Sequence, residues 1–82
     1  MNLPINSKSQ CKRIIDYLQA NAHGATTLEL VKELDVLRPG ARVCELRQEG
    51  YNIMTHWEIV HTALGTHKNA RYVLLNGTQN VN

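Results

Sequence analysis

Residues 37–53 read LRPGARVCELRQEGYNI and carry the clearest helix signals of the chain. Pro39 fixes φ near the helical value and lacks the N–H that a first helical turn leaves unpaired, so we expect a helix to begin at Pro39. Gly50 is expected to end it. Val43 and Leu46 share one face, which predicts a helix with one buried side. The opposite, exposed side is expected to present five polar side chains: Arg38, Arg42, Glu45, Gln48 and Glu49.

The length and composition predict one small folded domain. The chain has 82 residues, of which 43% are hydrophobic and 20% are charged. Folding at this size hides about two thirds of the surface of the chain, which leaves little room for a deep catalytic cleft. No stretch approaches the roughly 18 apolar residues of a membrane span, and residues 1–10 lack the hydrophobic core of a signal peptide. We therefore expect a cytoplasmic protein that has no membrane partner.

The net charge of +2 is small, but its distribution along the chain is uneven. The charges of residues 1–37 cancel, so the excess lies between residues 38 and 71. This excess supports an anionic partner without establishing one. The charged residues of that part are Arg38, Arg42, Arg47, Lys68 and Arg71 against Glu45, Glu49 and Glu58.

Two further helices are expected before Pro39. The first covers residues 8–22 and opens on a capping box formed by Ser7 and the glutamine three residues later. Thr26 and Glu29 form a second capping box, and the helix that follows is expected to end near residue 35. A connection of only three residues then leads to the third helix, which is typical of a helix-turn-helix corner.

After Gly50 the hydrophobic pattern changes to the period of a β-strand. Residues 53–60 alternate, and a second alternating run follows at 71–75, so we expect a β-hairpin. The segment between the runs, residues 61–70, is predicted to be a polar and mobile loop because it is longer than a tight turn. Trp57 and Tyr72 are interpreted as packing residues of the core or hairpin before they are considered for base stacking.

Three helices followed by a hairpin is the order of a winged helix, an α+β fold. Four segments resemble the winged helix-turn-helix domains of small bacteriophage and prophage proteins: SQCKRIIDYL, TTLELVKEL, ARVCELRQEGYNI and ARYVL. The resemblance covers roughly residues 9–75. It implies a winged-helix domain at residues 8–75. Residues 1–7 and the polar residues 76–82 are expected to be flexible ends.

The resemblance also implies a non-enzymatic protein that binds double-stranded DNA in a bacterial host cell, in transcription control or in another DNA transaction. In such domains the helix at 39–49 enters the major groove, and the loop at 62–70 is a wing beside it. Arg38 at the helix start suits a phosphate, whereas Arg42 and Gln48 suit base edges and Glu45 could accept from cytosine. The residues expected at the DNA are Arg38, Arg42, Glu45 and Gln48 on the helix and His67, Lys68 and Asn69 on the wing.

The residues leave two roles open for the arginines of this helix. Arg42 either contacts DNA or pairs with Glu45 or Glu49 on the helix surface. Arg47 flanks the buried stripe, so its stem is expected to pack over apolar surface while its head pairs locally.

The alternative function is a protein-interaction module that binds a host or phage protein, which Glu45, Glu49, Val60 and Leu64 favour. A homodimer on paired DNA half-sites is attractive for so small a domain, although no segment marks its seam.

The sequence contains no arrangement of residues that is typical of a metal site or a catalytic site. His56 and His61 differ by an odd number of positions, which places them on opposite faces of one strand. No paired His-x-x-x-His occurs, so we expect no metal and no cofactor. The two cysteines, Cys11 and Cys44, are expected to be free thiols, and Cys11 falls on the apolar stripe of its helix. No nucleophile, base and orienting group occur together, so we expect neither an enzyme nor a small-molecule substrate.

Overall fold

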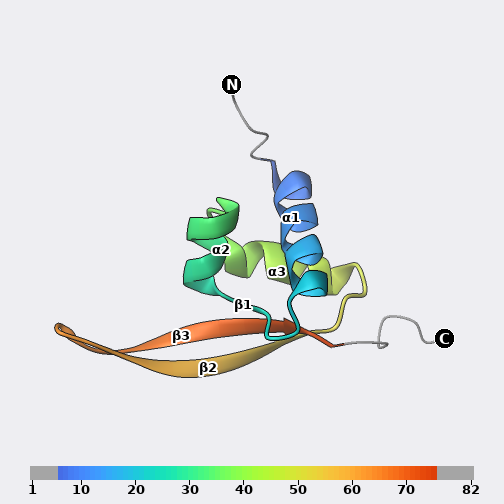
Figure 1. The fold of residues 1–82 in the computed structure, drawn as a ribbon. Helices are drawn as coiled ribbons and strands as arrows, with labels where there is room; N and C mark the ends of the chain where they lie inside the picture. The colour runs from blue at the N-terminus through green and yellow to red at the C-terminus, as the bar shows by residue number, and fades with distance from the viewer. Residues whose placement is uncertain (1–5, 76–82) are drawn as a thin grey trace.

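The computed structural model describes residues 6–75, which form three helices and a three-stranded antiparallel sheet (Figure 1). The strand order is β1-β3-β2. This arrangement confirms the predicted α+β winged helix, whereas residues 1–5 and 76–82 lie outside the described residues. The elements are α1 (Ser7–Ala20), β1 (Ala25–Thr26), α2 (Thr27–Leu34), α3 (Pro39–Gln48), β2 (Ile53–Thr62) and β3 (Gly65–Leu74).

The first helix begins one residue away from its predicted cap. The side chain of Asn6 accepts a hydrogen bond of 2.8 Å from the Ser9 N–H, so Asn6 is the N-cap and Ser7 is already helical. The predicted capping box at Ser7 is therefore wrong. Because the cap lies one position earlier, the Gln10 side chain belongs to the buried face instead of returning to the cap. The helix ends at Ala20, two residues before the expected end.

The second helix has the predicted capping box. The Thr26 hydroxyl accepts from the Glu29 N–H at 3.1 Å, and the Glu29 carboxylate accepts from the Thr26 N–H at 2.9 Å. At its end Asp35 takes the left-handed conformation with φ 58°. The Val36 N–H then donates to the Leu30 carbonyl at 3.0 Å, which turns the chain toward α3.

The third helix spans Pro39–Gln48, so both predicted boundary signals are confirmed. Pro39 stands in its first turn, and Gly50 follows its end with φ 105°. Val43 and Leu46 are buried, as their spacing predicted.

The hydrophobic core lies between the helices and the base of the sheet. Cys11 and Tyr72 belong to it, as the sequence predicted. Its buried members are Cys11, Ile14, Ile15, Leu18, Ala25, Leu30, Val36, Val43, Leu46, Ile53, Ala70 and Tyr72.

The hairpin is longer and its turn is tighter than the sequence predicted. Thr62 pairs with Gly65, so the connection is the two residues 63–64, and the predicted mobile loop at 61–70 is wrong. Gly65 has φ 139°, a conformation that glycine permits within so short a turn. The hairpin projects past the helices (Figure 1). Trp57, in the middle of β2 and opposite Ala70, is 66% exposed. The interpretation of Trp57 as a core residue is therefore wrong, although Ala70 opposite it is buried.

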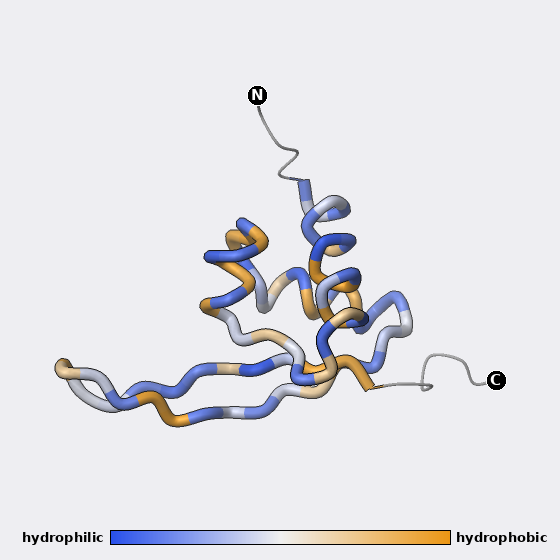
Figure 2. Tube along the Cα trace, viewed as in Figure 1, coloured by the Kyte–Doolittle hydropathy of each residue, from blue (hydrophilic) through white to orange (hydrophobic). Residues whose placement is uncertain are grey.

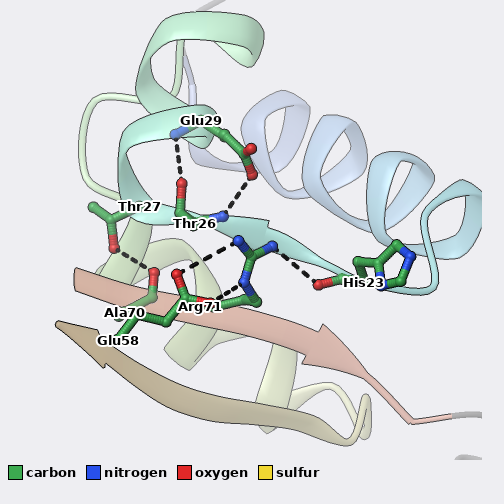
Figure 3. Close-up of polar contacts among 7 residues, drawn as sticks. All are labelled: His23, Thr26, Thr27, Glu29, Glu58, Ala70 and Arg71. Carbon is green, nitrogen blue, oxygen red and sulfur yellow. Dashed lines mark hydrogen bonds and ion pairs between the residues drawn. The ribbon is translucent and has the colours of Figure 1, made fainter. Parts of the chain in front are cut away.

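A polar cluster joins β3 to its neighbours on both sides (Figure 3). The Arg71 guanidinium donates to the Glu58 carboxylate on β2 and to the His23 carbonyl before β1, the latter at 3.2 Å. The hydrogen bond to Glu58 raises the already high pKa of Arg71. The Thr27 hydroxyl adds a bond of 3.5 Å to the Ala70 carbonyl. These contacts fix the direction of the hairpin relative to α2.

Candidate nucleic-acid interface

The start of α3 presents an exposed cation beside unpaired backbone donors. Arg38 is the N-cap residue, and no side chain caps this end of the helix. Arg38 is exposed and forms no ion pair with another residue in the range 6–75. Gly40, Ala41 and Cys44 continue along the exposed surface of α3 with small side chains. This surface therefore allows another molecule to approach the helix backbone closely.

Arg42 does not lie on that open surface. Its guanidinium forms an ion pair of 2.9 Å with Glu45, and its side chain is only 16% exposed against 40% for Glu45. Glu45 also accepts from the Cys11 thiol on α1 at 3.5 Å. The expectation of an exposed Arg42 is wrong, and the alternative pairing with Glu45 is the one observed. The packing of α1 against this part of α3 explains the difference, because it draws Arg42 and Glu45 toward Cys11.

Arg47 pairs locally, as the sequence predicted. Its guanidinium donates twice to the Ile53 carbonyl, at 2.9 and 2.7 Å, and once to the Thr55 hydroxyl at 2.9 Å. These bonds attach the last turn of α3 to the first residues of β2. Arg47 thus positions the hairpin relative to α3, a role that its sequence position next to Leu46 only partly indicated.

Gln48 remains on the exposed surface near the end of α3. Its amide lies 4.0 Å from the sulfur of Cys44, which is one turn earlier and also exposed. Gln48 and Arg38 therefore mark the two ends of the exposed surface of α3.

The three predicted wing residues lie on β3 instead of a loop. His67 pairs with Val60, Lys68 with Ile59 and Asn69 with Glu58, so Lys68 points to the opposite face of the hairpin from the other two. His67 and Lys68 are exposed, and Asn69 is half-buried. The sequence did not predict which face each residue occupies, because residues 65–69 lack the alternating apolar residues that mark a strand.

A groove of about 330 Å³ separates α2 from the hairpin. Sequence reasoning missed it, because its apolar residues come from distant segments of the chain. It is lined by Thr27, Leu28, Val31, Val60, His67, Lys68 and Asn69.

Residues 6–75 contain no group of three potential metal-ligating side chains. Within the same range, none of the helices is both long enough and apolar enough to cross a membrane.

The two free thiols are expected to differ strongly in reactivity. Burial, with the hydrogen bond to Glu45, raises the pKa of the Cys11 thiol to about 11, whereas Cys44 is exposed. A disulfide reagent at pH 8 should therefore modify one thiol of the native chain quickly, because the thiolate is the reactive form. Cys44→Ser should abolish the fast phase, and denaturant should expose Cys11. Two fast thiols in the native protein would contradict this assignment.

The same pKa difference predicts how stability depends on pH. A thiol whose pKa is raised in the folded state stabilises that state fully below its ordinary pKa of 9.0. This contribution is lost as the pH rises through about 11. The free energy of unfolding should therefore fall over this range by more in the wild type than in Cys11→Ala. Parallel curves from denaturant titrations of the two proteins would show that Cys11 makes no such contribution.

Comparison with known proteins agrees with this geometry. A family model described as a winged helix-turn-helix domain matches residues 9–77, which is most of the chain. No curated protein and no solved structure matches the chain. With its three helices, its antiparallel sheet and this match, the chain belongs to the winged helix-turn-helix domain family, whose members are typically DNA-binding modules without enzymatic activity.

Proposed function

We propose that this protein binds double-stranded DNA in the cytoplasm of a bacterial host, as a bacteriophage or prophage factor in transcription control or another DNA transaction. Membership of the winged helix-turn-helix family supports DNA binding. The phage or prophage origin rests on the resemblance of the four sequence segments described above.

The observation that carries the proposal is the exposed surface of α3. Arg38 stands unpaired at the end where the backbone N–H groups and the helix dipole favour an anion, so we assign it to a phosphate. The small side chains of Gly40, Ala41 and Cys44 allow α3 to lie deep in the major groove. Gln48 at the other end can donate to and accept from an adenine edge.

The remaining predicted site residues divide into two roles. Lys68, with His67 and Asn69 nearby on β3, is assigned to contacts with the DNA backbone beside the major groove. Arg42 and Glu45 are assigned an indirect role, because their ion pair and the Cys11 contact are used in holding α3 against α1.

The proposal predicts a steep dependence of DNA affinity on salt. With about four to six phosphates neutralised, at about −0.9 per phosphate, the logarithm of the association constant should fall with the logarithm of salt concentration with a slope of about −3.6 to −5.4. Fluorescence anisotropy of a labelled random-sequence duplex, titrated between 50 and 200 mM salt, measures this slope. A slope near zero, or no binding at the lowest salt, would overturn the proposal.

The alternative, a module that binds a host or phage protein, is favoured by the groove between α2 and the hairpin. Leu28 is 58% exposed there, beside the partly exposed Val31 and Val60. A folded protein that does not bind duplex DNA at any salt concentration would support this alternative. A homodimer would give a larger interface to either function, and on DNA its two copies would bind paired half-sites.

A further inference from the structure

We propose that two copies of this chain associate through the outer edge of β2, which joins their sheets into one continuous antiparallel sheet. β2 is an edge strand, because the order β1-β3-β2 leaves β3 on only one side of it. Figure 1 shows no described element beyond that edge. This edge would be the interface of a homodimer that forms in the absence of DNA.

The edge of β2 lacks several of the features that normally prevent strands from pairing between molecules, although it carries one charged residue, Glu58. Lysine, proline and β-bulges are the usual protections. β2 reads IMTHWEIVHT, which contains neither lysine nor proline, and its pairing with β3 runs without interruption from Ile53 to Thr62. Among residues 6–75, only the base of this edge is covered, where Arg47 donates to the Ile53 carbonyl. Within the same range no described strand or helix lies against the rest of the edge.

Both faces of β2 expose apolar side chains beside this edge. Trp57 and Ile59, at 66% and 55% exposed, share one face, and Met54 and Val60 share the other. Figure 2 shows an apolar stretch of the hairpin beyond the helices. A second β2 strand would cover these side chains on both faces, and their removal from water favours association.

The sequence of β2 is complementary to itself in one register. A twofold axis perpendicular to a sheet pairs one residue with its own copy, and residues that lie opposite share a face. With Trp57 at the axis, His56 lies opposite Glu58 of the second copy, and Met54 lies opposite Val60 of the second copy. Symmetry makes each of these contacts twice.

The neighbouring registers are worse for the Glu58 carboxylate. Centring on Glu58 places two carboxylates opposite each other, which is destabilising. Centring on His56 or on Ile59 places the carboxylate opposite Met54 or Val60. Glu58 already accepts from Arg71, and its remaining lone pairs can accept from a histidine N–H. The hydrogen bond from His56 to Glu58, and the avoided contact between two carboxylates, therefore select the register centred on Trp57 and favour a second copy over an unrelated strand.

The test uses the full chain without DNA, so its result is independent of the proposed function. Sedimentation equilibrium should show a reversible monomer–dimer equilibrium. Trp57 is the only tryptophan, so its fluorescence reports on the seam alone. Its emission should shift to shorter wavelength as the concentration rises, because the indole leaves water. A protein that stays monomeric at millimolar concentration, or a dimer whose emission does not move, would overturn the proposal.

A matched pair of variants tests the register. His56→Glu places a carboxylate opposite Glu58 of the second copy at two symmetric positions, so the dimer should weaken about tenfold or more. The monomer should keep its fold, because residue 56 lies opposite Arg71 on β3. His23→Glu makes the same change of charge at an exposed turn before β1 and should leave the dimer unchanged. Equal dissociation constants for the two folded variants would overturn the register.

Discussion

Gly24→Ala is expected to lower the free energy of unfolding by more than about 3 kcal/mol, a large part of the stability of so small a domain. Gly24 has φ 75°, which strains any residue with a side chain. An added Cβ would also overlap the Tyr72 carbonyl oxygen and lie 2.8 Å from its carbonyl carbon. Both atoms belong to the backbone of the central strand, so they cannot move aside without disturbing the pairing of β1 with β3.

Gly65→Ala separates the backbone strain of a positive φ from the overlap with the Tyr72 backbone. Gly65 also has a positive φ, at 139°, but an added Cβ would meet nothing within 4 Å. Its substitution should therefore cost only the conformational strain, about 1–3 kcal/mol. Urea denaturation followed by circular dichroism measures both variants. Equal losses of stability would show that the contact with Tyr72 contributes nothing.

The double variant Arg38→Ala/Lys68→Ala should lose roughly 50-fold in affinity for a random-sequence duplex at 0.1 M salt, because each phosphate contact is worth about 0.9 in the salt slope. The slope itself should become shallower by about 2. Neither side chain forms an ion pair with residues 6–75, so the fold should be little affected. Anisotropy titrations at several salt concentrations measure both quantities.

Lys12→Ala is the control for the loss of a positive charge elsewhere on the surface. Lys12 is exposed on α1, where it pairs with Asp16 at 3.0 Å. It lies outside the proposed interface, so its loss should leave the salt slope unchanged. If Lys12→Ala weakens DNA binding as much as the double variant, affinity depends on the net charge of the protein and not on the position of each cation, and the assigned interface is wrong.

The helices were largely predictable because their signals are local. The Thr26–Glu29 capping box and the helix at Pro39–Gln48 depend on residues within one turn of each other. The start of α1 was missed because Asn6 and Ser7 are adjacent and both are good caps. A shift of one residue was enough to move Gln10 from the helix start to the buried face.

The site was less predictable because tertiary contacts decide it. Helical periodicity predicted Arg42 on the exposed side of α3, whereas in the structure it pairs with Glu45, which also contacts Cys11 on α1. The hairpin was predicted too short for a related reason. Its outer residues are exposed on both faces and are held by backbone pairing, so their strand conformation leaves no hydrophobic pattern to read.

The bonds from Arg47 to Ile53 and Thr55 have a consequence for redesign of DNA specificity. They attach α3 to the base of the hairpin, so under the proposed DNA-binding function the exposed residues of α3 can be exchanged for those of another DNA-binding helix while Arg47 is retained. A graft that replaces Arg47 together with its neighbours would uncouple the two elements, and a correctly chosen set of base contacts would then meet the duplex at the wrong angle.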